Sequence, residues 1–398
     1  MRLPILAAAV ALTASAATAD PSPLSAEIAT TGIAATEARL AALPDPTPPD
    51  LFALAGLRFL SGVEGALQLR WQTGLDSEWS ELPILRLPIP QNPAPRPFEP
   101  QDLTTLLTGL DGDMETARTA LDQLGAQDFA LEIAVGDLWF DINMNSKRDE
   151  GEDLASVAGI TLGARGMASA DIIAPTIRFD TADAAWLTAY THLLSGVAQV
   201  ALAYDPAQAV QRVMSASQEM AALQGPTPPN NAMDYMFGHW VDRAAIILHA
   251  LSQKPDAALG QSAQAHFLEM VHNNQRFWTL VAVETDNDSE WIPNAHQVSG
   301  LGIAMPEGIA ERWQAVLADA EKILTGELLV PHWRFGGDAG IDVSMMFKDP
   351  PAVDLIAMIQ GEGFLPYARK GPQASAQSWN EFERMLYGDA ILFAVFFN

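Results

Sequence analysis

Residues 180–204 read DTADAAWLTAYTHLLSGVAQVALAY, and this stretch decides the fold class. Its large apolar residues recur every three or four positions, a spacing that places them on one face of an α-helix. They are Trp186, Leu187, Tyr190, Leu193, Leu194, Val197, Val200 and Leu202. Asp180 stands at the start, where a carboxylate accepts hydrogen bonds from the free N–H groups of a first helical turn. The stretch is therefore predicted to form an amphipathic helix capped by Asp180.

The same helical spacing recurs through most of the chain. It is found at residues 50–71, 232–251, 256–281 and 306–324. Strand-like alternation is scarce, and its best candidates are residues 81–87 and 171–179. Proline removes a backbone donor and fixes φ, so the proline-rich stretches 44–49, 88–100 and 226–229 are predicted to be irregular connections. We expect a mainly α-helical protein, a multi-helix bundle or stack with long proline-rich connections and little sheet.

Composition excludes several classes of protein. With 49% hydrophobic residues the chain can bury a core, which argues against disorder over its whole length. Its net charge of −27 repels phosphate backbones and anionic lipid surfaces, so no nucleic-acid partner is expected. The chain contains no cysteine, which excludes disulfides, thiolate zinc sites and thiol nucleophiles. Cations are the expected small partners.

The N-terminus has the three regions of a secretory signal peptide. Arg2 supplies a positive charge, residues 5–12 are apolar, and Ala17-Thr-Ala19 matches a small-residue cleavage site. The alternative is an N-terminal helix that is not cleaved. We expect a signal peptide at 1–19, a helical half at 20–165 and a second helical half at 166–398, or one continuous domain from 20 onward. No later segment is long and apolar enough to span a membrane, and the expected location is periplasmic or secreted.

Residues 141–152, DINMNSKRDEGE, carry the most specific chemical pattern. Oxygen-bearing side chains occupy positions 1, 3, 5, 9 and 12 of this window. Calcium prefers six to eight oxygen ligands, with a bidentate carboxylate at position 12 completing the shell. The expected ligands are the side chains of Asp141, Asn143, Asn145, Asp149 and Glu152 and the backbone carbonyl of Lys147. The alternative is a polar turn that binds no ion.

In this window the sequence resembles the EF-hand calcium loop, and it is most similar to the single EF-hand-like loops of secreted bacterial proteins, including the dockerin type. Two positions depart from that pattern. Ser146 stands where the family has a glycine at positive φ, and Arg148 stands where paired EF-hands have an apolar residue. The second departure favours an isolated loop. An exported loop of this kind is expected to bind calcium with a Kd of about 10⁻⁴ to 10⁻³ M.

A second unusual segment holds Glu284, Asp286, Asp288 and Glu290 within a few residues of Trp291. These carboxylates are expected either to share a cation or to provide one acid of raised pKa for general acid catalysis, or else to form an acidic exit from a helix, with Asp288 or Ser289 as a cap. The interpretation as a helix exit is favoured. Residues 178–186, residues 284–294 and the loop together resemble an uncharacterised set of secreted helical bacterial proteins, a resemblance that implies no activity.

Other candidate groups are weaker. His266, Glu269 and His272 form half of a di-iron carboxylate pattern whose second half is missing, so structural histidines are favoured. Trp291 and Trp333 lie beside polar segments and are candidates for the lining of a ligand groove. The sequence lacks Gly-x-Ser-x-Gly, the phosphate-binding Gly-x4-Gly-Lys-Ser/Thr loop and His-Glu-x-x-His.

The sequence thus favours an exported calcium-binding protein of unknown activity, a binding or structural module of the bacterial envelope. Its expected partners are a calcium ion and an unidentified protein or small-molecule ligand. The competing interpretation is a periplasmic hydrolase whose acids come from residues 284–290, with His296 or His332 as base.

Overall fold

The structure is a computed structural model that describes residues 21–75, 87–154, 175–224, 232–287, 289–302, 305–386, 394 and 397. The predicted signal peptide at 1–19 and the predicted boundary at 165/166 lie outside these residues. The predicted strand at 81–87 also lies outside them, except for Leu87.

The described chain is mainly helical, as predicted. Its first part contains α1 (Pro23–Ala41), α2 (Pro48–Thr73), α4 (Pro100–Leu124), strand β1 (Ala130–Ala134) and the short 3₁₀ helix η1 (Val135–Asp137). Strand β2 (Thr176–Asp180) leads into α6 (Thr181–Ala203), α7 (Pro206–Gln224), α8 (Ala232–Ser252), α9 (Ala257–Val281) and α10 (Ile309–Thr325). The last part contains β3 (Ala339–Ile341), α11 (Val343–Lys348), α12 (Leu355–Gln360), η2 (Glu362–Tyr367), β4 (Ala368–Lys370) and α13 (Gln377–Met385).

The five segments with helical spacing all form helices, namely α2, α6, α8, α9 and α10. Local capping explains two of the starts. The Thr47 hydroxyl and the Asp50 carboxylate form a reciprocal capping box at the start of α2. Asp180 caps α6 and accepts the N–H of Ala182, again as predicted. The strand predicted at 171–179 is found at Thr176–Asp180, and residues 171–174 are outside the described part.

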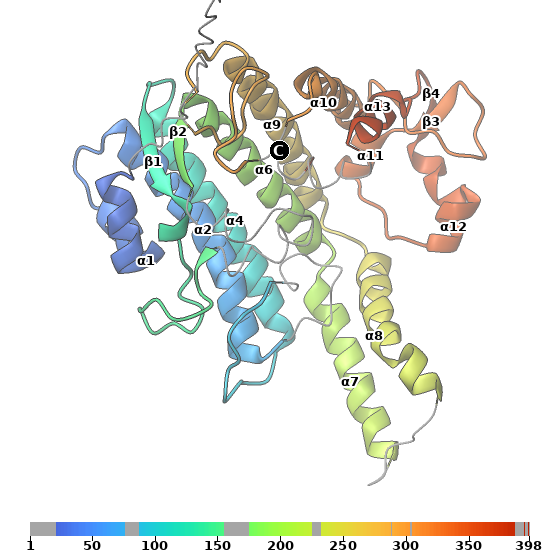
Figure 1. Cartoon of the computed structure of the whole chain (residues 1–398). Coiled ribbons are helices and arrows are strands. Elements are labelled where there is room, and N and C mark those ends of the chain that lie inside the picture. Colours follow the sequence, from blue (N-terminus) through green and yellow to red (C-terminus); the bar gives the residue numbers. More distant parts are fainter. Residues whose placement is uncertain are drawn as a thin grey trace, which may run out of the picture.

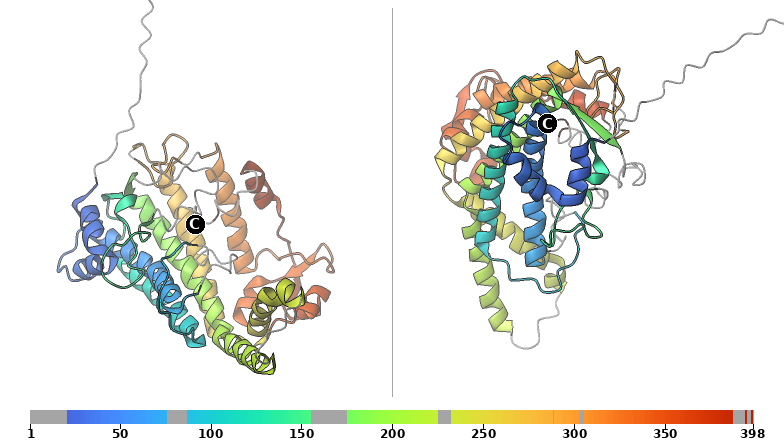
Figure 2. Two further views of the ribbon diagram at one scale, coloured as in Figure 1. Left: turned by 60° about the horizontal axis from the view of Figure 1, so that its bottom comes forward. Right: turned by 90° about the vertical axis from the view of Figure 1, so that its left-hand side faces the viewer.

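The body of the molecule is a layer of helices in which α6 lies between α4 and α9, and α2 packs against α4 (Figure 1). Strands β1 and β2 form an antiparallel pair in which Leu131 is opposite Phe179. This pair and α1 cover one side of the body (Figures 1 and 2). Helices α7 and α8 pack against each other and project from one end of the body. None of the helices in the described part of the chain is long and apolar enough to cross a membrane.

Two hydrophobic cores flank this layer. The first joins α1, α2, α4, β1 and the start of α6, with Phe52, Leu67 and Phe140 among its buried residues. The second joins α9, α10 and α13 and includes Trp278 and Phe397, the latter from the apolar C-terminus. The loop at 141–152 is attached to the first core. The segment after α9 runs from the second core towards the first.

Candidate functional site

The loop at 141–152 is anchored to the first core at both ends. The N–H of Phe140 donates to the carbonyl of Glu152 (2.9 Å), and Trp139 and Asp153 form an antiparallel bridge just outside that pair. Trp139 is buried, and its indole N–H donates to the carbonyl of Ile28 in α1 (2.9 Å). Because both flanking ends are held, the residues between them form a compact loop.

The first half of the loop wraps around the Asp141 carboxylate. The N–H groups of Asn145 and Ser146 donate to its two oxygens, each at 2.9 Å. Asn143 Oδ1 accepts the N–H of Asn145 (3.1 Å), and Asn145 Oδ1 accepts the N–H of Lys147 (2.8 Å). Ser146 has a φ of 59°, the positive value that the EF-hand pattern requires at this position. An L-residue with a Cβ is strained there, as the sequence predicted.

The Glu152 side chain accepts hydrogen bonds from both halves of the loop. Its side chain is fully buried, its Oε1 accepts the N–H groups of Ile142 (3.0 Å) and Asn143 (3.3 Å), and its Oε2 accepts the N–H of Asp149 (2.9 Å). Burial raises the pKa of Glu152, and these three donors oppose that shift. The carboxylate at position 12 is therefore buried and fixed in orientation.

Asp149 faces the two asparagines across the loop. Its Oδ2 accepts the side-chain amides of Asn143 (2.7 Å) and Asn145 (2.6 Å), which lower the pKa of Asp149. The side chains at positions 3, 5 and 9 thus contact one another. They meet through amide nitrogens, so both amide groups must rotate before their oxygens can face a cation.

Glu64 of α2 lies directly beneath this loop, and the sequence analysis missed it. Its Oε2 accepts the N–H of Asp141 (2.8 Å), and Gln68, one turn further along α2, donates its side-chain amide to the carbonyl of Asp141 (2.9 Å). Glu64 is only 7% exposed, and burial is the main cause that raises its pKa to about 7. The sequence does contain a signal for this contact, because Glu64 is a charged residue on the apolar face predicted for residues 50–71, between Leu57 and Leu67.

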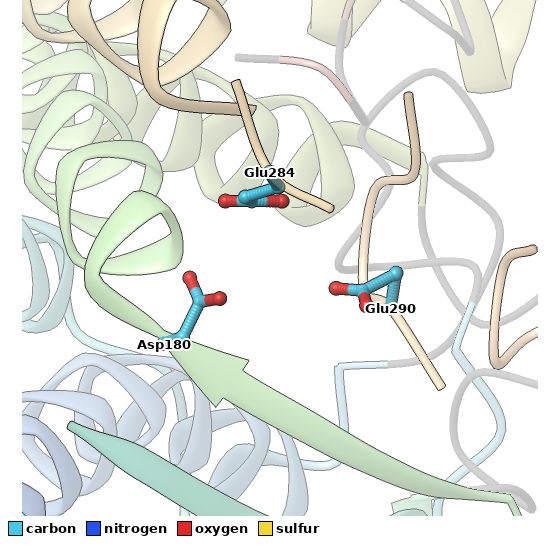
Figure 3. Close-up of side chains that lie close together, drawn as sticks. All are labelled: Asp180, Glu284 and Glu290. Atoms are coloured by element: carbon cyan, nitrogen blue, oxygen red, sulfur yellow. The ribbon is translucent and has the colours of Figure 1, made fainter. Parts of the chain in front are cut away.

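A second group of acids forms at the junction of β2, α6 and the segment after α9. One carboxylate oxygen each from Asp180, Glu284 and Glu290 lies within 4.8 Å of the others. Figure 3 shows the three side chains pointing towards a common space from three separate segments. This is the one group of three or more possible metal ligands of the His, Cys, Asp and Glu types in the described residues.

The electrostatics of this group favour bound protons or a cation. Burial, followed by the negative charge of Asp180, raises the pKa of Glu284 to about 7. Burial also raises the pKa of Asp180, and that of Asp183, which lies beneath it, more strongly still. Asp286 pairs with Arg178 (2.7 Å), whose Nη1 also lies 3.8 Å from Asp180 Oδ2. Asp288 lies outside the described residues, and Ser289 caps no helix, because the next described helix is α10.

The favoured interpretation of 284–290 as a simple helix exit is therefore incomplete. The sequence analysis considered Glu284 and Glu290 together and gave Asp180 only its capping role. These residues are about a hundred positions apart, and no local pattern indicates that they meet.

The other predicted candidates do not join either group. His266 Nδ1 contacts His192 Nδ1 of α6 (2.8 Å), whereas His272 faces Glu321 of α10 (3.4 Å). Because these two histidines face different helices, His266, Glu269 and His272 do not form one site, in agreement with the structural interpretation.

Neither histidine proposed as a hydrolase base belongs to the three-carboxylate group. His296 is exposed, and His332 contacts the carbonyl of Met358 (3.2 Å). The two tryptophans proposed for a ligand groove also differ in position. Trp333 is 75% exposed, whereas Trp291 packs against Trp186 with ring centroids 5.4 Å apart.

Comparison with known proteins identifies no relative. The chain matches no protein-family model, no curated protein and no solved structure.

Proposed function

We propose that this chain is an exported calcium-binding protein in which residues 141–152 hold one ion. The observation that carries the proposal is the arrangement of Asp141, Asn143, Asn145, Asp149 and Glu152 around one loop, with the spacing and the positive φ at Ser146 that calcium loops use. The Lys147 carbonyl completes the proposed ligand set. The protein acts in the periplasm or outside the cell, as a binding or structural module for an unidentified protein or small molecule.

In this proposal, calcium replaces the weaker hydrogen bonds that hold the loop together in the structure. The two amides on Asp149 supply partial positive charge where the ion would supply a full one. Upon binding, the asparagines present oxygens, Glu152 contributes both of its oxygens, and the loop gains ionic bonds across positions 1 to 12. Because both arms lie on the first core, the ion stabilises that core rather than a hinge.

Calorimetric titration of the mature chain with calcium tests the proposal, combined with thermal unfolding with and without the ion. Glu152→Gln and Asp149→Asn should each weaken binding at least tenfold and reduce the calcium-dependent rise in Tm. Glu150→Gln is the matched control, since it removes the same charge from an exposed position of the loop that is not in the ligand set. Equal losses in all three variants, or no heat with the wild type at millimolar calcium, would refute the site.

A second candidate, hydrolysis, draws on the three-carboxylate group. Glu284, with a pKa of about 7, is partly protonated near neutral pH, which suits a general acid. A hydrolase of this kind should lose activity on a model glycoside or ester as pH rises through about 7, and Glu284→Gln should abolish that activity. Activity that is unchanged in Glu284→Gln would exclude this role.

A further inference from the structure

The first core contains an apolar cavity of about 290 Å³ that is partly open to solvent. Its wall is built from α1, α2, β1, β2, the start of α6 and the two arms of the loop at 141–152, with Trp291 and Leu301 closing one side. Five aromatic rings contribute to the wall, those of Phe52, Phe59, Phe179, Trp186 and Trp291. Every wall residue in the described part of the chain is apolar, aromatic or glycine.

A void of this size and character is suited to a ligand. Protein interiors pack as densely as organic crystals, and their ordinary voids are smaller than a few water molecules. Water needs two to four polar partners, which this wall does not offer. At about 30 Å³ for a group the size of a water molecule, the cavity accommodates about ten such groups. The chemistry that fits is therefore a hydrocarbon chain of about ten carbon atoms.

The negative charge of the chain selects the head group. Asp180 directly follows the wall residue Phe179, and Glu290 directly precedes the wall residue Trp291. Their carboxylates and that of Glu284 lie within 4.8 Å of one another, and Arg178 Nη1, 3.8 Å from Asp180 Oδ2, offsets part of their charge. The chain as a whole still carries a net charge of −27. An anionic head group would be repelled by this charge, whereas a neutral or cationic one would not.

We propose that the cavity binds the hydrocarbon chain of a single-chain amphiphile whose head group is not anionic. The chain makes dispersion contacts with the aromatic and aliphatic wall, and the head group remains towards solvent. The site is separate from the proposed calcium loop, and its ligand needs no metal.

Fluorescence of the neutral apolar probe 1-naphthylamine, whose eleven non-hydrogen atoms match the size of the cavity, tests the cavity in the mature chain, refolded from urea to remove any co-purified ligand. One equivalent of probe should bind. Decanol below its solubility limit and decyltrimethylammonium below its critical micelle concentration should displace it, and decanoate should do so about tenfold less well or worse. Absence of probe binding would overturn the cavity as a ligand site. Displacement by decanoate as effective as that by decanol would overturn the head-group assignment.

A matched pair of variants locates the bound probe. Gly56 of α2 lies in the cavity wall, and a Cβ built on it meets no atom within 4 Å. Gly65 lies on the same helix with equally open space, but outside the wall. Gly56→Leu should weaken probe binding at least tenfold, and Gly65→Leu should leave it unchanged. Gly56→Ala, a smaller change, should weaken binding to a lesser degree and covers the case in which the leucine variant does not fold. Equal probe affinity in the Gly56 and Gly65 variants would place the probe elsewhere and overturn the proposal.

Discussion

The substitution Gly56→Leu should make the ligand-free protein more stable, because Gly56 lines the cavity and a Cβ built on it meets no atom within 4 Å. Gly56 lies inside α2, where glycine costs about 1 kcal/mol relative to a good helix former. Burying a leucine side chain contributes about 1.5–3 kcal/mol more. The expected gain in the free energy of unfolding is therefore about 3 kcal/mol.

Gly65→Leu separates the two contributions. It has the same helical context, but its side chain does not enter the cavity, so it should gain only the helix-propensity part of about 1 kcal/mol. The difference between the two variants, about 2 kcal/mol, measures the burial of the side chain within the cavity.

Urea unfolding followed by far-UV circular dichroism measures both variants, with the transition that contains α2 fitted separately if the two cores unfold in steps. Decanol should stabilise the wild type and Gly65→Leu but not Gly56→Leu, because only protein that binds the ligand gains stability from it. A Gly56→Leu variant no more stable than Gly65→Leu would refute the argument. It would mean that the free protein has no open space beside α2.

Three further predictions concern protons and coupling. Burial, followed by the charge of Arg118, lowers the pKa of His192 to about 3, below the unfolded value of about 6.5. The neutral His192 therefore contributes stability above pH 6.5, and this contribution is lost as pH falls towards 3. His192→Gln should flatten that slope in urea unfolding at a series of pH values. The pKa of Glu284 is raised from 4.5 to about 7, so its contribution is full below pH 4.5 and is lost as pH rises through 7. Glu284→Gln should remove this loss, and a slope equal to that of the wild type would contradict it. Calcium bound at 141–152 should tighten binding of the naphthylamine probe, and an affinity that calcium does not change would exclude coupling.

The sequence predicted those features whose cause is local. Helical spacing at 50–71 and 180–204 depends on residues three or four positions apart, and the Asp180 cap depends on the next turn only. The hydrogen bonds within 141–152 likewise join residues at most ten positions apart, and the convergence of the predicted ligand oxygens on one ion stays a prediction.

Features that depend on tertiary contacts were not predicted. His192 and His266 meet because α6 packs against α9, and Glu284 and Glu290 meet Asp180 because the segment after α9 returns to β2. The spacing of apolar residues along one helix does not indicate which other helix it packs against. The cavity is a further example, since its wall combines residues from Ile28 to Leu301, and each wall residue alone indicates only an ordinary core position.

The placement of the loop gives a physical reason for coupling between the two proposed sites. Leu138 and Leu154, one on each arm of the loop, both line the cavity, and the N–H of Leu154 donates to the carbonyl of Leu138 (2.9 Å). The next pair inward is Phe140 with Glu152, the residue proposed to bind calcium through both oxygens. An ion that fixes Glu152 therefore fixes the same two-stranded bridge that forms part of the cavity wall. Any ligand that packs against Leu138 and Leu154 favours the closed bridge in turn, and this coupling must be equal in both directions.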